Sequence, residues 1–216
     1  MSTQTEQEQI EELKNFWTEY GKPIFIGILL AITVVAVWKF WENRQLTNKM
    51  KEAQNYQMLV IAMSQPIEQV KEADVASIAD QLQQVNPNSY YAQYAKFYLA
   101  KVAAHQGKLE DAAKSLQVVL DKPADKVLEE LARQRLAQVL AAQDKIDEAL
   151  KLLDAPVAKA FTASRQELKG DLLLKQGNTE QARTAYQEAL TAAETAKSAN
   201  VVIIKLKLND LAKEGA

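Results

Sequence analysis

The side chains that could carry out chemistry are few in this sequence. His105 is the only histidine and cysteine is absent, so a thiol nucleophile and a zinc site built from histidine and cysteine are both excluded. His105 precedes Gly107 at the expected end of a helix, where the helix dipole stabilises a cation. We therefore expect His105 to have a helix-capping role.

Two acidic pairs, Glu110-Asp111 and Asp147-Glu148, are the other candidates for acid–base catalysis. Each pair lies at the expected start of a helix, where negative charge compensates the helix dipole. The six glycines never cluster into a phosphate-binding loop. Because no set of acids, bases, nucleophiles or metal ligands converges, we expect no enzymatic activity, no metal and no cofactor.

The composition predicts an all-α protein. Alanine, leucine, glutamine, lysine and glutamate dominate, whereas the 216 residues include only six glycines and five prolines. The net charge is -2, without the basic excess that is typical of a nucleic-acid-binding surface. We therefore expect no nucleic-acid partner.

An uncharged apolar run over residues 23–38 predicts a single transmembrane helix, with its flanks, over residues 22–41. The run is slightly shorter than the roughly 20 residues that a span needs. Aromatic and lysine side chains at both ends suit the two interfaces of a lipid bilayer. These flanking residues are Trp17, Tyr20, Lys22, Trp38, Lys39 and Trp41.

Two other readings of this run are a buried core helix and a cleavable signal peptide. A core helix does not need aromatic rings at both ends. A signal peptide is disfavoured because an acidic segment precedes the run and bulky Trp38, Phe40 and Trp41 stand where small residues would mark cleavage. An uncleaved anchor is therefore favoured.

Residues 1–21 form a short segment that includes a candidate amphipathic helix over residues 4–21. Charge alone leaves the orientation of the anchor open. Two lysines precede the anchor and four basic residues follow it, at positions 39, 44, 49 and 51. Taken literally, the positive-inside rule keeps the C-terminal side in the cytoplasm, but the rule is weak for a long translocated domain.

Residues 42–216 are predicted to form a tetratricopeptide-like array of helix pairs. The clearest copy covers residues 163–196, and weaker copies lie near residues 93–126 and 130–156. Within the clearest copy a small Gly170 and a large Tyr186 occupy positions where two helices would approach closely. The alanines Ala112, Ala149 and Ala182 recur at spacings of 37 and 33, typical of helix-pair repeats. An ordinary helical bundle is the alternative.

The two ends of this array have weaker patterns. Residues 42–85 look like another helix pair, interrupted by Pro66. Residues 199–213 are expected to form a capping helix that covers the last repeat through Ile203, Leu206 and Leu208. The β-branched run at residues 201–204 leaves a strand as an alternative for this piece.

In such arrays the first helices of successive pairs line a groove that binds peptides. The predicted groove residues are Tyr94, Phe97, Lys101, His105, Gln134, Gln138, Glu167, Asp171 and Lys175.

The order of an acidic N-terminal segment, an anchor and a late repeat resembles the YfgM-like ancillary SecYEG translocon subunit family. The resemblance is carried by Phe16-Trp17 and Gly21-Lys22 before the anchor, by Trp38 and Trp41 after it, by Leu136-Ala137 with Val139, by residues 168–189 and by residues 206–209. It implies a bacterial inner-membrane protein with a cytoplasmic N-terminus and a periplasmic domain. It also implies association with the SecYEG translocon and with a membrane-anchored periplasmic chaperone or prolyl isomerase.

We therefore expect a membrane-anchored protein-binding module that passes emerging polypeptides to the periplasmic chaperone network. One alternative is a scaffold for another envelope-assembly complex. A second is a membrane-tethered regulator that sequesters a signalling protein, which the charge bias around the anchor permits.

Overall fold

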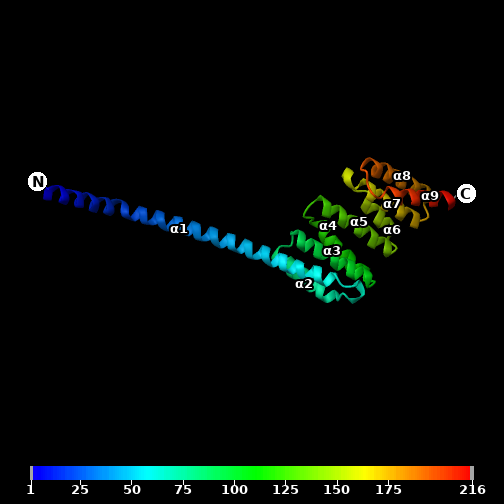
Figure 1. Cartoon of the computed structure of the whole chain (residues 1–216), viewed down its shortest axis with the longest axis horizontal. Helices are drawn as coiled ribbons and strands as arrows, with labels where there is room; N and C mark the ends of the chain where they lie inside the picture. The colour runs from blue at the N-terminus through cyan, green and yellow to red at the C-terminus, as the bar shows by residue number, and fades with distance from the viewer. Residues whose placement is uncertain (1, 215–216) are drawn as a thin grey trace. The chain divides into compact units, whose positions relative to one another are not determined.

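A computed structural model describes residues 2–214, and every regular element in that range is helical (Figure 1). The α-helices are α1 (Ser2–Met63), α2 (Glu72–Val85), α3 (Tyr90–His105), α4 (Leu109–Asp121), α5 (Lys126–Ala142), α6 (Ile146–Leu153), α7 (Thr162–Lys175), α8 (Thr179–Thr195) and α9 (Val201–Glu214). Two short 3₁₀ helices, η1 (Ile67–Gln69) and η2 (Lys159–Phe161), lie in the connections before α2 and α7. The expected all-α class is confirmed.

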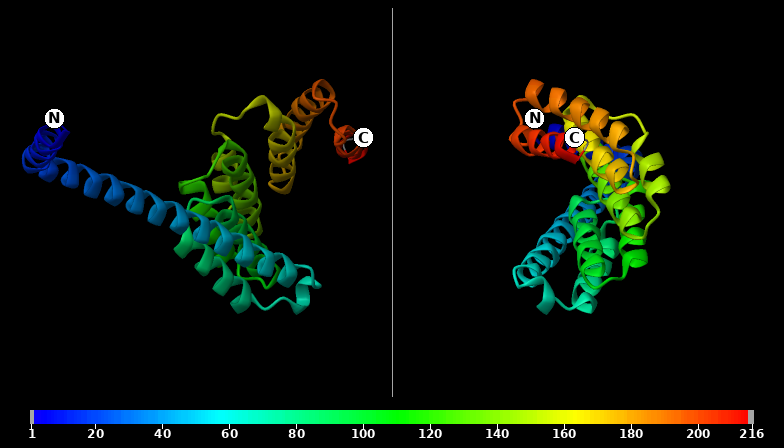
Figure 2. Two further views of the ribbon diagram at one scale, coloured as in Figure 1. Left: turned by 60° about the vertical axis from the view of Figure 1, so that its left-hand side comes forward. Right: turned by 90° about the vertical axis from the view of Figure 1, so that its right-hand side faces the viewer.

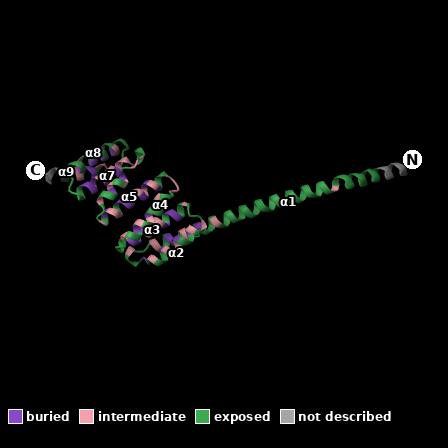
Figure 3. Ribbon diagram, turned by 180° about the vertical axis from the view of Figure 1, so that it is seen from behind, coloured by how far each residue is buried: buried purple, intermediate pink, exposed green. Residues whose placement is uncertain are grey.

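The chain divides into two units, residues 1–51 and residues 52–216. The first unit consists of the N-terminal part of α1, whose side chains are exposed at nearly every described position (Figure 3). Pro23 lies inside this helix, which begins at Ser2. The described residues include one helix that is long and apolar enough to cross a membrane, and it is α1. The exposed apolar stretch therefore fits a single-pass anchor.

The second unit is a stack of helical hairpins, each packed on the next in chain order (Figure 2). Helices α3 and α4, α5 and α6, and α7 and α8 form the three predicted pairs. The geometry itself is that of antiparallel helix pairs joined by turns of three residues.

The turns inside the three pairs share one hydrogen-bond pattern. In each, a backbone N–H donates to the carbonyl five residues earlier: Lys108 to Ala103, Lys145 to Leu140 and Asn178 to Leu173, each at 2.9 Å. This bond satisfies a free carbonyl at the end of a helix and requires a left-handed residue in the turn. Gly107 and Gly177 fill that position in two pairs, and Asp144 fills it in the third with φ of 61°.

Small residues let the paired helices approach closely. Ala112, Ala149 and Ala182, the repeated alanines, are all fully buried. In the last pair Gly170 of α7 faces the ring of Tyr186 of α8. The sequence expectation that a small residue faces a large one is therefore confirmed.

The first pair of the stack consists of the C-terminal turns of α1, residues 52–63, and α2. Leu59 of α1 is fully buried among Val75, Ala79 and Leu82 of α2. Pro66 follows the end of α1, as expected from the sequence. The core begins within α1 itself.

The last helix, α9, packs on α8 and confirms a helix where a strand was the alternative. Of the three residues expected to cover the last repeat, Leu208 does so, whereas Ile203 and Leu206 do not. Ile203 and Leu206 are more than half exposed, whereas Val201, Ile204, Leu208 and Leu211 contact the core. The contacting residues are spaced by three or four, so they share one face of the helix, and Ile203 and Leu206 lie on another face.

Candidate functional site

A groove of about 660 Å³ lies between α3, α4 and α5. Its walls come chiefly from α3 and α5, the first helices of two successive pairs. The lining residues are Tyr94, Phe97, Tyr98, Ala100, Lys101, Ala104, Leu109, Leu116, Leu131, Arg135, Gln138, Val139 and Ala142. The groove therefore lies where the repeat pattern placed a peptide-binding surface.

Apolar side chains make up most of this groove. Leu116 is buried, and Phe97 and Val139 are partly buried against the same core cluster. The rings of Tyr94 and Phe97 lie 6.5 Å apart, and Tyr94 remains 38% exposed. Aromatic rings with an exposed polar tip suit contact with another polypeptide, because one end is apolar and the other can donate a hydrogen bond.

The aromatic surface continues from the groove to α1. Tyr56 lies 4.9 Å from Tyr91 and 6.3 Å from Tyr94, measured between ring centroids. Burial raises the pKa of Tyr56 above its ordinary value, and nearby tyrosines add to this shift. Tyr90, at the first position of α3, donates a hydrogen bond of 3.1 Å to Asp125 Oδ2. Tyr56 therefore stays neutral at physiological pH.

The charged residues that line the groove are Lys101 and Arg135, both exposed. Arg135 Nη1 donates a hydrogen bond of 2.9 Å to Gln138 Oε1. Of the nine predicted groove residues, the structure thus brings together Tyr94, Phe97, Lys101 and Gln138.

The other predicted groove residues make contacts elsewhere. His105 Nε2 lies 3.6 Å from Glu68 Oε1, and His105 forms the last position of α3 as expected. Gln134 Nε2 donates hydrogen bonds of 2.8 Å to Glu130 Oε1 and 3.0 Å to Ser164 Oγ. Neither residue lines the groove between α3 and α5.

The three predicted residues on α7 also contact parts of the domain. Lys207 of α9 donates hydrogen bonds of 2.8 Å to Glu167 Oε1 and 2.6 Å to Asp171 Oδ1. Lys175 Nζ donates to the Ala141 carbonyl and lies 3.2 Å from Asp144 Oδ1. Lys207 of α9, the Ala141 carbonyl of α5 and Asp144 in the turn after α5 therefore already contact these three side chains.

Lys207, Glu167, Asp171 and Tyr186 form one hydrogen-bonded cluster, the Lys207 cluster. Burial alone lowers the pKa of Lys207, but its hydrogen bonds to Asp171 and Glu167 outweigh burial and raise that pKa overall. The Tyr186 hydroxyl donates a 2.7 Å hydrogen bond to Asp171 Oδ1, and burial together with this bond raises the pKa of Tyr186. The cluster therefore holds α7, α8 and α9 together.

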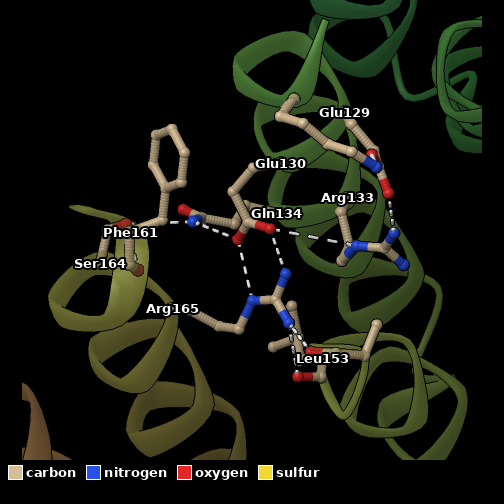
Figure 4. Close-up of polar contacts among 10 residues, drawn as sticks. Glu129, Glu130, Arg133, Gln134, Leu153, Phe161, Ser164 and Arg165 are labelled. Carbon is tan, nitrogen blue, oxygen red and sulfur yellow. Dashed lines mark hydrogen bonds and ion pairs between the residues drawn. The ribbon is translucent and has the colours of Figure 1, made fainter. Parts of the chain in front are cut away.

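A buried ion pair, which the sequence did not predict, joins the α5–α6 pair to the α7–α8 pair (Figure 4). Arg165 of α7 donates from Nε to Glu130 Oε1 of α5 at 2.8 Å, and from Nη2 to Glu130 Oε2. Its Nη1 donates to the carbonyls of Leu153 and Ala155 after α6. Both side chains are less than 8% exposed. A paired, hydrogen-bonded charge of this kind is structural and not a catalytic group.

Glu129 and Arg133 extend this network to the surface of α5. Arg133 Nη2 donates to Glu129 Oε1 at 2.9 Å, and Lys126 Nζ donates to Glu129 Oε2 at 2.6 Å. The hydrogen bond from Lys126 is the largest cause of the lowered pKa of Glu129; burial opposes this shift, and the hydrogen bond from Arg133 adds to it. Both neighbouring carboxylates on α5 are therefore already paired within the chain.

A second hollow, of about 840 Å³, lies against α8 and contains none of the predicted residues. Threonine and glutamine side chains of α8, together with Lys159 and Thr162, line it. Among the described residues, no group of three or more acidic, histidine or cysteine side chains could hold a metal ion. The groove between α3 and α5 is therefore the strongest candidate site.

The predicted flanks of the anchor are all exposed on α1. Trp17 and Tyr20 lie on the N-terminal side, and Trp38 and Trp41 lie on the C-terminal side with ring centroids 6.2 Å apart. Lys22 and Lys39 are exposed next to these aromatic groups. This arrangement is that of side chains available to the two interfaces of a bilayer.

Comparison with known sequences extends over nearly the whole chain. A sequence model described as "Tetratricopeptide repeat-like domain" matches residues 14–213. A protein of Escherichia coli is 28% identical over 96% of this chain and 97% of its own length, and one of Haemophilus influenzae is 27% identical over 95% and 97%. A protein of Neisseria gonorrhoeae is 28% identical over 86% of this chain and 87% of its own. All three are named "Ancillary SecYEG translocon subunit", which confirms the resemblance seen in the sequence.

The same fold occurs in a solved structure. MamA of Desulfovibrio magneticus, residues 41 to the end, superposes with a TM-score of 0.52 and covers 76% of this chain and 96% of its own. Its sequence is 16% identical. At this level of identity the likeness concerns the stacked helical hairpins alone.

Proposed function

The chain belongs to the tetratricopeptide repeat-like domain family, and from that premise we propose that it is a membrane-anchored, protein-binding subunit of the SecYEG translocon. The observation that carries this proposal is the match to relatives of that name across almost the full length of both chains. The match includes the anchor as well as the repeats. A relative that shared only the repeats would support protein binding but not a place beside the translocon.

The finer part of the proposal concerns topology and clients. Residues 1–21 lie in the cytoplasm, residues 22–41 cross the bacterial inner membrane, and residues 42–216 lie in the periplasm. The groove between α3 and α5 binds translocated polypeptides and passes them to membrane-anchored periplasmic chaperones, including a prolyl isomerase. Tethering favours this role because it raises the local concentration of a weak binder near the translocon exit. Binding alone suffices, so no catalytic step is assigned.

Orientation is tested with a reporter fused after Ala216. Alkaline phosphatase is a suitable reporter because it becomes active only where its disulfides form, outside the cytoplasm. Phosphatase activity of the fusion supports a periplasmic location of residues 42–216. The opposite result is a stable but inactive phosphatase fusion together with a fluorescent fusion at Ala216 that is bright because it folds in the cytoplasm. That result means a cytoplasmic domain and favours the tethered regulator.

The partner is tested by cross-linking in cells. A photoreactive amino acid is placed at Tyr94 or Phe97 in the groove, and at exposed Val118 of α4 as a matched control outside it. We expect translocon subunits or translocating chains to cross-link from the groove positions and not from Val118. Recovery of cell-wall or outer-membrane assembly proteins alone contradicts the proposal and favours the envelope scaffold.

A further inference from the structure

We propose that the groove between α3 and α5 selects acidic, apolar polypeptide segments, whose carboxylates bind Lys101 and Arg135 while their aromatic or large aliphatic side chains fill the apolar space. This inference rests on the proposed function, because it names the class of segment that the same groove takes.

The charge of the groove is entirely of one sign. Lys101 and Arg135 are its charged lining residues, and no aspartate or glutamate lines it. Neither cation takes part in any salt bridge found among the described side chains, although Arg133, on the same helix as Arg135, pairs with both Glu129 and Glu130. Two cations beside an apolar surface, without an acidic partner, are complementary to carboxylates of a ligand.

The hydrogen-bonding capacity of these two side chains is largely unused. A guanidinium carries five N–H donors, and one nitrogen of Arg135 donates to Gln138 Oε1. The remaining N–H groups of Arg135 and the ammonium of Lys101 can donate hydrogen bonds to a carboxylate without breaking an ion pair within the domain. The ligand therefore gains charge-assisted hydrogen bonds at little cost to the fold.

The apolar part of the groove sets the second requirement on the ligand. Phe97 and Tyr98 of α3 face Leu131, Val139 and Ala142 of α5 across the groove. A purely acidic segment would leave this surface in contact with water, whereas large apolar side chains of the ligand remove it from water and so favour binding. An acidic segment that also carries leucine or phenylalanine satisfies both requirements.

The two cations come from neighbouring repeats. Lys101 is on α3, the first helix of one pair, and Arg135 is on α5, the first helix of the next. A segment that spans the groove can therefore meet both, so that binding depends on two cations at once. A single compact anion would not cover the apolar surface between the two cations.

The test uses the full chain in a zwitterionic detergent and three short, fluorescently labelled peptides. Each peptide has the same leucine and phenylalanine positions, and the residues between them are glutamate, glutamine or lysine. We expect the glutamate peptide to bind roughly tenfold or more tightly than the lysine peptide, the difference expected of one or two charge-assisted contacts. We also expect this preference to shrink as salt is added.

Charge reversal supplies the decisive comparison. The double variant Lys101→Glu, Arg135→Glu should reverse the preference between the glutamate and lysine peptides. The matched control Lys145→Glu changes the charge of an exposed lysine that neither lines the groove nor forms a salt bridge, and should leave the preference unchanged. Circular dichroism melting checks that each variant folds. If the charge-reversed variant does not fold, the double variant Lys101→Gln, Arg135→Gln replaces it, and we expect it to lose the preference for the glutamate peptide.

The outcomes separate this inference from the proposed function. Equal binding of the three peptides, binding of none, or an unchanged preference in the folded charge variants overturns the selection of acidic segments. Persistent cross-links from Tyr94 to translocating chains, found together with any of these results, leave the proposed function standing. Loss of cross-links to the translocon and to translocating chains, with the peptide preference intact, contradicts the proposed function and leaves the selection of acidic segments standing.

Discussion

The ring of Tyr186 lies so close to Gly170 that a methyl group built on Gly170 would come within 2.6 Å of ring atoms Cδ1 and Cε1. Tyr186 is almost fully buried, and its hydroxyl is held by Asp171 at 2.7 Å. The ring therefore has little room to move aside. The close approach of α7 and α8 depends on the absence of a side chain at Gly170.

We expect Gly170→Ala to destabilise the domain by about 1–2 kcal/mol. The overlap with Tyr186 costs roughly 1–3 kcal/mol, which exceeds the gain of about 0.5–1 kcal/mol from replacing glycine within a helix. Urea unfolding followed by circular dichroism measures the change. Lys169→Ala, at the neighbouring half-exposed position, is the control and should change stability by less than about 0.5 kcal/mol. A stabilised Gly170→Ala variant contradicts the packing described here.

The buried pair of Glu130 and Arg165 should behave as a unit. Arg165→Met alone is expected to cost about 3–5 kcal/mol, because it leaves a buried carboxylate without its partner. Adding Glu130→Leu should recover a large part of that loss. A double-mutant cycle with urea unfolding measures the coupling, and simple additivity of the two changes would show that the pair does not interact.

Stability should fall as the pH rises above about 10. Lys207 and Tyr186 both have a pKa raised in the folded domain above the ordinary values of 10.5 and 10.0. Above pH 10 the folded state therefore holds more protons than the unfolded state, so deprotonation favours unfolding. Below pH 10 both groups are protonated in either state, and their contribution is fully present.

The variant Tyr186→Phe isolates one of these two groups. Because it lacks the hydrogen bond to Asp171, its free energy of unfolding at neutral pH should be lower by roughly 1 kcal/mol. Between pH 10 and pH 11 its stability should fall less steeply than that of the unaltered chain. Urea midpoints measured across this range give the slope. A slope equal to that of the unaltered chain would mean that the Tyr186 hydroxyl does not titrate with folding.

The anchor should be sensitive to charge at its centre. Leu29→Arg places a cation in the middle of residues 22–41, where it opposes insertion by roughly 2.5–3.5 kcal/mol. We expect a smaller fraction of this variant in membranes after an alkaline wash. Leu46→Arg is the control, because Leu46 is also exposed on α1 but lies after the predicted span. Recovery of the unaltered chain from the soluble fraction without detergent would contradict an anchor of any orientation.

The sequence was sufficient for most of the fold because the repeat pattern is local. The left-handed turn residues and the small residues opposite large ones fall within a single helix pair, so their spacing is visible in the sequence. Gly177 and Ala182 are examples. For α9 the prediction was right for Leu208 but wrong for Ile203 and Leu206, because Ile203 and Ile204 are alike in sequence and only the packing on α8 separates them.

The candidate site was predictable only in part, because it depends on contacts between repeats. Tyr94, Phe97, Lys101 and Gln138 could be placed in a groove from their positions on first helices. Arg135 was missed, although it lies one helical turn before Val139 on the same face as the lining residues of α5. Glu130 and Arg165 are 35 residues apart, so the sequence around either residue does not identify its partner. A charged residue within an otherwise buried helical face was the available signal.

Leu59 is wholly buried although it belongs to the same continuous helix, α1, that contains the exposed apolar stretch. A protease that severs α1 before Glu52 releases a fragment that keeps this part of the hydrophobic core. A fragment that starts between Leu59 and Pro66 instead lacks Leu59, so that α2 keeps its packing on α3 but loses its packing on α1. The solubility of a shortened fragment is therefore decided by where within α1 it starts.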